Sequence, residues 1–242
     1  MACFVFGGID YSDVLDVESI DMPALPATSP ELRTASGRDG ALLAGNRLEP
    51  LEIKIKARLA TDGIDPRDIQ RRWAQEAARM RSEEPQALYL TQGVYRMAVL
   101  ADASPLEFRS YSATAELTFL CPDPIAYGLQ RAVTVPSGGS VTFSVGGTYP
   151  TRPRVTANAV RNASSLVWGL RLDGGDFLHI ATGSASAKAV AVDCAARTCT
   201  VDSAVALPTL DSDWLALAPG VHTLQMDAGT GAASVVYDER WL

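Results

Sequence analysis

Hydrophobic and polar residues alternate along two stretches in the first half of the chain, a pattern typical of strands with one buried face. The stretch Leu48–Ala60 carries an apolar residue at every second position: Leu51, Ile53, Ile55, Ala57 and Leu59. The stretch that closes at Cys121 repeats the pattern: Ala113, Ala115, Leu117, Phe119 and Cys121. Shorter extended segments are predicted at Val14–Met22, Gln86–Thr91 and Val94–Asp102, and the last two form a hairpin. The short connections make this sheet antiparallel.

One strong helix is predicted, over Pro66–Arg81. Asp65 suits the N-cap, and Pro66 suits the first helical position, where its missing N–H costs nothing. An apolar stripe recurs at helical spacing: Ile69, Trp73, Ala77 and Met80. The arginines lie largely off this stripe: Arg67, Arg71, Arg72, Arg79 and Arg81. We interpret them as solvated side chains rather than a phosphate-binding face, paired with nearby acids. These acids are Asp68, Glu76, Glu83 and Glu84.

The second half of the chain has short extended segments at regular spacing and no convincing helix. Strands are predicted at Arg131–Val135, Val141–Val145, Arg154–Val160, Leu166–Leu172, Phe177–Thr182, Ala189–Asp193, Thr198–Asp202, Trp214–Leu217, Val221–Asp227 and Ala233–Tyr237. Glycine-rich turns separate them, which favours an all-β sandwich of jelly-roll type. Trp241, next to the last residue, is expected to plug the end of this sandwich.

The change in element type divides the chain into two domains, 1–126 and 127–242. Pro122 and Pro124 fall at the change, and proline cannot donate to a sheet ladder. The first domain is therefore expected to be a β-sandwich or split β-barrel with one helix. The fold class is mainly β, with an α+β first domain.

The stretch Pro23–Gly45 shows little periodicity and many turn-forming residues. It is predicted to be a long irregular loop. Such loops are uncommon inside compact domains and are usually functional or mobile, so we interpret this one as an interaction arm.

The net charge of the chain argues against nucleic acid as a binding partner. The formal net charge is −7, and residues 1–126 carry 13 Lys and Arg against 19 Asp and Glu, while the remainder carries 8 against 9. An acidic first half argues against groove reading of nucleic acid, which normally needs a basic face. No apolar run is long enough to span a bilayer, and the start lacks the basic region of a secretory signal, so a soluble protein made in a cytoplasm is expected.

No catalytic constellation, metal site or cofactor site is evident. The sequence has no nucleophile elbow, no zinc-protease motif and no P-loop. Cys194 and Cys199 could bridge a hairpin, but free thiols are expected in a cytoplasm. A zinc site that joins them to His179 and His222 lacks a recognised ligand spacing. The carboxylate pairs near strand ends are interpreted as surface acids. They are Asp211 with Asp213, and Asp238 with Glu239.

Several short motifs recur in the order found in one protein family. They are the Phe/Gly opening, the Gly37-Arg38-Asp39-Gly40 element, the charged alternating strand before a capped helix, the strand running into Phe119, Pro122, Asp123, Pro124 and Tyr127, and the closing DWLALAPGVHTLQMDAG…VVYDERWL. In this order and spacing the whole chain resembles the distal tail proteins of long-tailed bacteriophages, the Dit or Sipho-tail family. It departs from that family in having no marked insertion in the second domain and in its cysteines at positions 194 and 199.

The resemblance implies a structural hub of the phage tail tip or baseplate and not an enzyme. The first domain would form a homo-hexameric ring that continues the tail tube, and a galectin-like second domain would project outward. The ring would join the tail tube protein to a tail-tip hub protein and to receptor-binding components. DNA would pass through it without specific binding. Such a protein is assembled in the host cytoplasm and resides in the virion.

The resemblance implies two candidate sites, an assembly interface and a domain junction. The assembly interface is expected at Gly37, Arg38, Asp39, Gly40 and Arg47, and the domain junction at Pro122, Asp123, Pro124 and Tyr127.

A carbohydrate-binding β-sandwich module is the alternative function. Its aromatic platform would come from Tyr149, Trp168, Phe177, Trp214 and Trp241. These residues lie within strand patterns, which favours a place in the core. An esterase or glycosidase is disfavoured because the motifs are missing.

Overall fold

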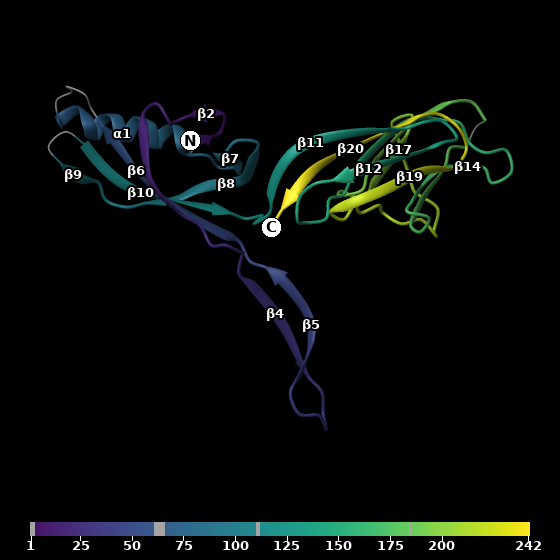
Figure 1. Cartoon of the computed structure of the whole chain (residues 1–242), viewed down its shortest axis with the longest axis horizontal. Helices are drawn as coiled ribbons and strands as arrows, with labels where there is room; N and C mark the ends of the chain where they lie inside the picture. Colours follow the sequence, from purple (N-terminus) through teal and green to yellow (C-terminus); the bar gives the residue numbers. More distant parts are fainter. Residues whose placement is uncertain (1–2, 61–65, 110–111, 184) are drawn as a thin grey trace. The chain divides into compact units, whose positions relative to one another are not determined.

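The computed structural model describes residues 3–60, 66–109, 112–183 and 185–242 and divides into two compact units. Unit 1 comprises residues 1–126 together with Leu242, and unit 2 comprises residues 127–241. Figure 1 traces both units in the colours of the sequence. Within the described residues, no helix is long and apolar enough to cross a bilayer.

Unit 1 is an antiparallel sheet with one helix. Its elements are β1 Val5–Phe6, β2 Ile9–Asp10, β3 Leu15–Asp21, β4 Thr28–Thr34, β5 Ala41–Leu48, β6 Leu51–Ala60, α1 Pro66–Met80, β7 Gln86–Thr91, β8 Val94–Ala103, β9 Glu107–Arg109 and β10 Ser112–Cys121. The main strands lie in the order β7, β8, β10, β6, β3, with β1 on the outer side of β7. The strands predicted from alternation are confirmed, and the short edge strand β9 was not predicted.

The pairing of β6 with β10 organises the unit. These strands are antiparallel in continuous register from Leu51↔Cys121 to Ala60↔Ser112. Because side chains alternate along a strand, this register places both apolar series on one face of the sheet. Ile53 and Phe119, which are paired in the register, are both fully buried.

Helix α1 covers the buried face. Ile69 and Met80 are fully buried and Trp73 is 4% exposed, as the predicted stripe requires, while Ala77 is half-buried. The indole N–H of Trp73 donates to the carbonyl oxygen of Ala113 on β10, at 3.2 Å. The predicted N-cap, Asp65, lies outside the described residues.

The stretch predicted as an irregular loop is instead a β-hairpin, so that prediction is wrong. Strands β4 and β5 form a two-stranded sheet of their own, visible in Figure 1 as a long hairpin. All seven residues of β4 are exposed, and β5 has only half-buried or exposed residues. A strand with both faces in solvent has no reason to alternate apolar with polar residues, so the periodic signal was absent.

Unit 2 is a sandwich of two antiparallel sheets. Its strands are β11 Ala126–Val135, β12 Ser140–Val145, β13 Arg154–Ala159, β14 Val167–Leu172, β15 Phe177–Ala181, β16 Lys188–Asp193, β17 Thr198–Val201, β18 Ala204–Ala206, β19 Gly220–Ala228 and β20 Ala233–Trp241. One sheet has the order β18, β17, β16, β13, β20, β11, and the other has the order β12, β19, β14, β15. The mainly β fold class with one helix is confirmed.

Two predictions about unit 2 are wrong. Trp214–Leu217 is not a strand, because its one ladder contact with the described residues is the isolated bridge between Thr151 and Leu217. Its apolar pattern reflects burial of Leu215 and Leu217 in the core and not a ladder. Trp241 does not plug the sandwich, since it ends β20 with 38% of its surface exposed.

Candidate assembly surfaces

The β4–β5 hairpin carries the residues predicted for assembly, but it separates them. Gly37, Arg38, Asp39 and Gly40 form its tip, where both glycines adopt positive φ angles of 79° and 84°. Arg47 pairs with Ser29 next to the base of the hairpin. The five predicted residues therefore belong to one hairpin without converging on one site.

Exposed leucines distinguish this hairpin. Leu32 and Leu43 stand opposite each other in the register and are 62% and 64% exposed, and Leu42 is 45% exposed. An isolated two-stranded hairpin is at best marginally stable in water. Because the leucines remain uncovered within the chain, the hairpin has the properties of a surface that a partner molecule covers. The sequence analysis did not predict these leucines as part of the assembly surface. Apolar residues within a stretch rich in turn-forming residues could have indicated it.

The residues predicted at the domain junction make local contacts. The carboxylate of Asp123 accepts a hydrogen bond from the backbone N–H of Ile125 at 3.1 Å, which shapes the turn between Pro122 and Pro124. Tyr127 belongs to unit 2, where its ring lies 5.2 Å from the guanidinium of Arg240.

The basic face of α1 is partly neutralised by neighbouring acids. Arg71 pairs with Asp68 at 3.3 Å and Arg79 pairs with Glu76 at 3.2 Å, each three residues apart. Two of the four predicted acids are thus confirmed as partners. Glu83 and Glu84 form no ion pair within the part of the chain that the structure describes.

The two histidines of unit 2 bind carboxylates. The Nε2 atom of His179 lies 2.6 Å from Asp227, whose carboxylate also accepts two hydrogen bonds from Arg171, at 2.9 and 3.1 Å. The Nδ1 atom of His222 lies 2.7 Å from Asp173. The bonds from Arg171 hold the pKa of Asp227 below its usual value. These contacts tie neighbouring strands together and provide no activated nucleophile.

Cys194 and Cys199 do not form a metal site with the histidines. Cys194 and Cys199 are free thiols inside the core of the sandwich. Burial raises the pKa of Cys194 to about 11, so it is a neutral thiol and a poor metal ligand at neutral pH. Among the described residues, no cluster of three or more potential ligands could hold a metal ion.

The carboxylate pairs also have structural partners. Glu239 forms an ion pair with Arg131 at 3.0 Å, and Asp238 accepts a hydrogen bond from Gln130 at 3.1 Å. The pKa of Asp211 is lowered, first by the hydroxyl of Thr209. A glycosidase needs one carboxyl group with a raised pKa, and this change is in the opposite direction.

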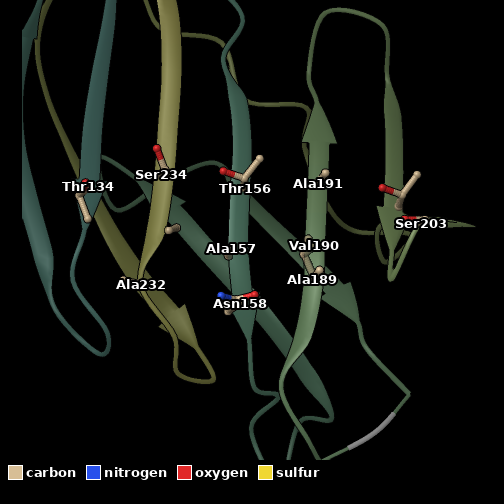
Figure 2. A pocket seen from close by; sticks show the side chains of 12 residues that line it. Thr134, Thr156, Ala157, Asn158, Ala189, Val190, Ala191, Ser203, Ala232 and Ser234 are labelled. Atoms are coloured by element: carbon tan, nitrogen blue, oxygen red, sulfur yellow. The ribbon is translucent and has the colours of Figure 1, made fainter.

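Unit 2 also has a shallow depression of about 460 Å³ on the face of its larger sheet. Figure 2 shows small side chains from adjacent strands lining it, among them Thr134, Thr156, Asn158 and Ser234. None of the twelve described residues that line it is aromatic, so it offers no stacking surface for a sugar ring. Of the five aromatics considered for such a platform, Trp168 is fully buried and Trp241 is exposed at the end of β20, while Tyr149, Phe177 and Trp214 are half-buried.

A family model matches part of the chain. Residues 146–241 match the family model described as the siphovirus-type tail component, C-terminal domain. The comparison with curated protein sequences finds no match.

The comparison with solved structures then finds a similar fold over the whole chain. The crystal structure of the SPP1 Dit protein (gp 19.1), described as a paradigm of the hub of the adsorption apparatus in phages that infect Gram-positive bacteria, has a TM-score of 0.80. It is 19% identical in sequence, and the match covers 100% of both chains. Two structures of the phage P2 baseplate in its activated conformation also match, with Ca and with Sr. Both have a TM-score of 0.46. The structure with Ca is 9% identical, and the match covers 95% of this chain and 92% of the other. The structure with Sr is 8% identical, and the match covers 98% of both chains. The resemblance to phage distal tail proteins that the sequence indicated is confirmed.

Proposed function

We propose that this protein is the distal tail hub of a long-tailed phage, a structural component and not a catalyst. The observation that carries the proposal is the agreement of the fold with SPP1 Dit over the full length of both chains, together with the family match of residues 146–241. Unit 1 forms a homo-hexameric ring, and unit 2 is the outer, galectin-like domain. The protein resides at the tail tip of the virion after assembly in the host cytoplasm.

In this role the ring joins the tail tube protein to a tail-tip hub protein and to receptor-binding components, and DNA passes through its lumen. A ring of identical subunits needs a heterologous contact, in which different patches of neighbouring subunits meet. The hairpin with its exposed leucines supports this assignment, because it is a surface that unit 1 leaves uncovered.

Native mass spectrometry and negative-stain electron microscopy test the proposal. We expect rings with six times the mass of the 25.7 kDa chain, single or stacked in pairs, when the protein is concentrated or mixed with its tail tube protein. Replacing Gly37-Arg38-Asp39-Gly40 with a flexible linker of equal length should weaken assembly and leave the circular dichroism spectrum unchanged. A chain that remains monomeric at every concentration, with the tube protein present, would refute the proposal.

A further inference from the structure

A small cavity opens on unit 1 beside the outer strand β3. Its volume is about 130 Å³, similar to engineered apolar cavities that accept a molecule as large as benzene. Most of its lining is apolar: Ile20, Met22, Ile53, Leu88, Leu90 and Val94, together with the polar Thr91 and the charged Arg96. Ile20 and Met22 are 36% and 40% exposed and form its open rim. The cavity can therefore receive one side chain or the end of a turn from outside.

Among the described residues that line the cavity, Arg96 is the only charged one, and no described residue balances its charge. Its Nε atom is buried and has no hydrogen-bond partner. No described residue forms an ion pair with it, and burial lowers its pKa. The group that interacts with it electrostatically is Cys121, whose own pKa burial raises to about 11, so the thiol carries no compensating charge at neutral pH. A partly buried guanidinium without a carboxylate partner lowers the stability of the fold. A hydrogen-bond acceptor from another molecule would remove this penalty.

The tip of the β4–β5 hairpin has the complementary chemistry. Asp39 lies between two glycines at the tip, exposed, and no described residue pairs with its carboxylate. Leu42 and Leu43 follow within four residues and are exposed. The tip therefore presents an unpaired carboxylate next to apolar side chains, whereas the cavity presents an unpaired guanidinium next to an apolar rim.

We propose that the cavity at Arg96 receives the hairpin tip of a second copy of this chain, with Asp39 paired to Arg96 and the leucines covering Ile20 and Met22. The second copy is the occupant because the leucines and Asp39 are exposed in their own chain, and each surface supplies what the other lacks. The contact joins two different patches, as a closed ring of identical subunits requires. This inference rests on the proposed ring and names the site that receives the hairpin.

Charge reversal with rescue tests the contact. Arg96→Glu and Asp39→Arg should each raise the concentration needed for half-assembly by about tenfold or more, since each places like charges together. A chain that carries both substitutions should recover assembly, because every interface then contains a reversed pair. Arg152→Glu, an equal charge change at an exposed residue of unit 2, is the control and should assemble as the wild type does.

Arg96→Met separates assembly from folding. It keeps an unbranched side chain of similar length and removes the unpaired charge, so the monomer should be at least as stable as the wild type towards urea while assembly weakens. Unchanged assembly of both Arg96 variants, or failure of the double reversal to assemble better than either single variant, would overturn the inference while wild-type rings leave the proposed function standing. A wild-type chain that forms no ring would overturn both.

Discussion

A hydrogen bond from the indole N–H of Trp73 to the backbone carbonyl of Ala113, at 3.2 Å, joins the helix of unit 1 to its sheet. The indole is 4% exposed, so its removal leaves a buried carbonyl without this partner. Trp73→Phe keeps most of the apolar contact and should lower the free energy of unfolding by about 1 to 2 kcal/mol. Trp73→Ala also leaves a cavity and should cost about 3 to 5 kcal/mol.

Urea denaturation followed by far-ultraviolet circular dichroism measures both changes. Gln75→Ala on the exposed side of the same helix is the control and should stay within about 0.5 kcal/mol of the wild type. A Trp73→Phe variant as stable as the wild type would show that the hydrogen bond contributes nothing.

Gly147 has no room for a side chain. Its φ angle is 100°, and an added Cβ would collide with the carbonyl oxygen of Arg240. We expect Gly147→Ala to destabilise unit 2 by about 3 kcal/mol or more, because backbone strain and a collision with main-chain atoms combine. Gly138 is the matched control: its φ angle is 66°, but nothing lies within 4 Å of an added Cβ. Gly138→Ala should cost only the left-handed penalty of about 1 to 2 kcal/mol, and equal losses at the two sites would contradict the steric argument.

The four cysteines should differ sharply in reactivity. Burial raises the pKa of Cys121 and of Cys194 to about 11 and also raises that of Cys199, whereas Cys3 is only half-buried. Under native conditions at about pH 8, iodoacetamide should label Cys3 first and the other three only after denaturation. Peptide mass spectrometry locates the label. Rapid native labelling of Cys194 would mean that the core of the sandwich opens readily.

Asp173 and His222 should give unit 2 a stability maximum in mildly acidic solution. Burial by itself lowers the pKa of His222, but the hydrogen bonds to Asp173 and to the Ala218 carbonyl outweigh it, and the net pKa is raised above 6.5. The backbone N–H of Thr223, followed by His222, lowers the pKa of Asp173 below 3.8. The histidine contribution is complete below the unfolded pKa of 6.5 and is lost as the pH rises through the folded value. The aspartate contribution is complete above 3.8 and is lost as the pH falls through the folded value.

The melting temperature of wild type minus that of His222→Gln, measured across pH, tests this pair. The difference should be largest between about pH 4 and 6.5 and should shrink on both sides. Asp173→Asn should remove the same maximum. A difference that grows steadily towards alkaline pH would contradict the assignment of the pair.

Strands with one buried face could be predicted from the sequence, and strands with two exposed faces could not. The apolar series of β6 and β10 follows from burial of one side of a sheet, so the alternation marks both strands. The β4–β5 hairpin has no buried side, and its pairing depends on backbone hydrogen bonds that leave no trace in side-chain pattern. The reverse error occurred at Trp214–Leu217, where burial of two leucines produced a strand-like pattern without a ladder.

Prediction from sequence was also incomplete for the two sides of the proposed contact, the hairpin tip and Arg96. The element Gly37–Gly40 was proposed as an interface from the family resemblance alone, within a stretch predicted to be an irregular loop. The structure places it at the tip of a hairpin, where both glycines adopt positive φ. Arg96 was not found, because an arginine in a strand carries no sequence signal for a missing partner. Only the three-dimensional arrangement shows that its Nε atom is buried among apolar side chains.

The protein should interact only weakly with DNA, because its first unit carries a net negative charge. Residues 1–126 carry six more acidic than basic residues, and in α1 Arg71 and Arg79 are already paired with Asp68 and Glu76. Each phosphate that a Lys or Arg neutralises adds affinity through counterion release, so a conduit with a basic wall would hold the passing duplex. We therefore expect no binding of a labelled duplex by fluorescence anisotropy at up to about 100 µM protein and about 150 mM salt. The arginines of α1 should accordingly face away from the lumen of the ring. Micromolar binding at this salt concentration, or a ring structure with Arg71, Arg72 or Arg79 lining the channel, would show that the wall of the conduit is basic.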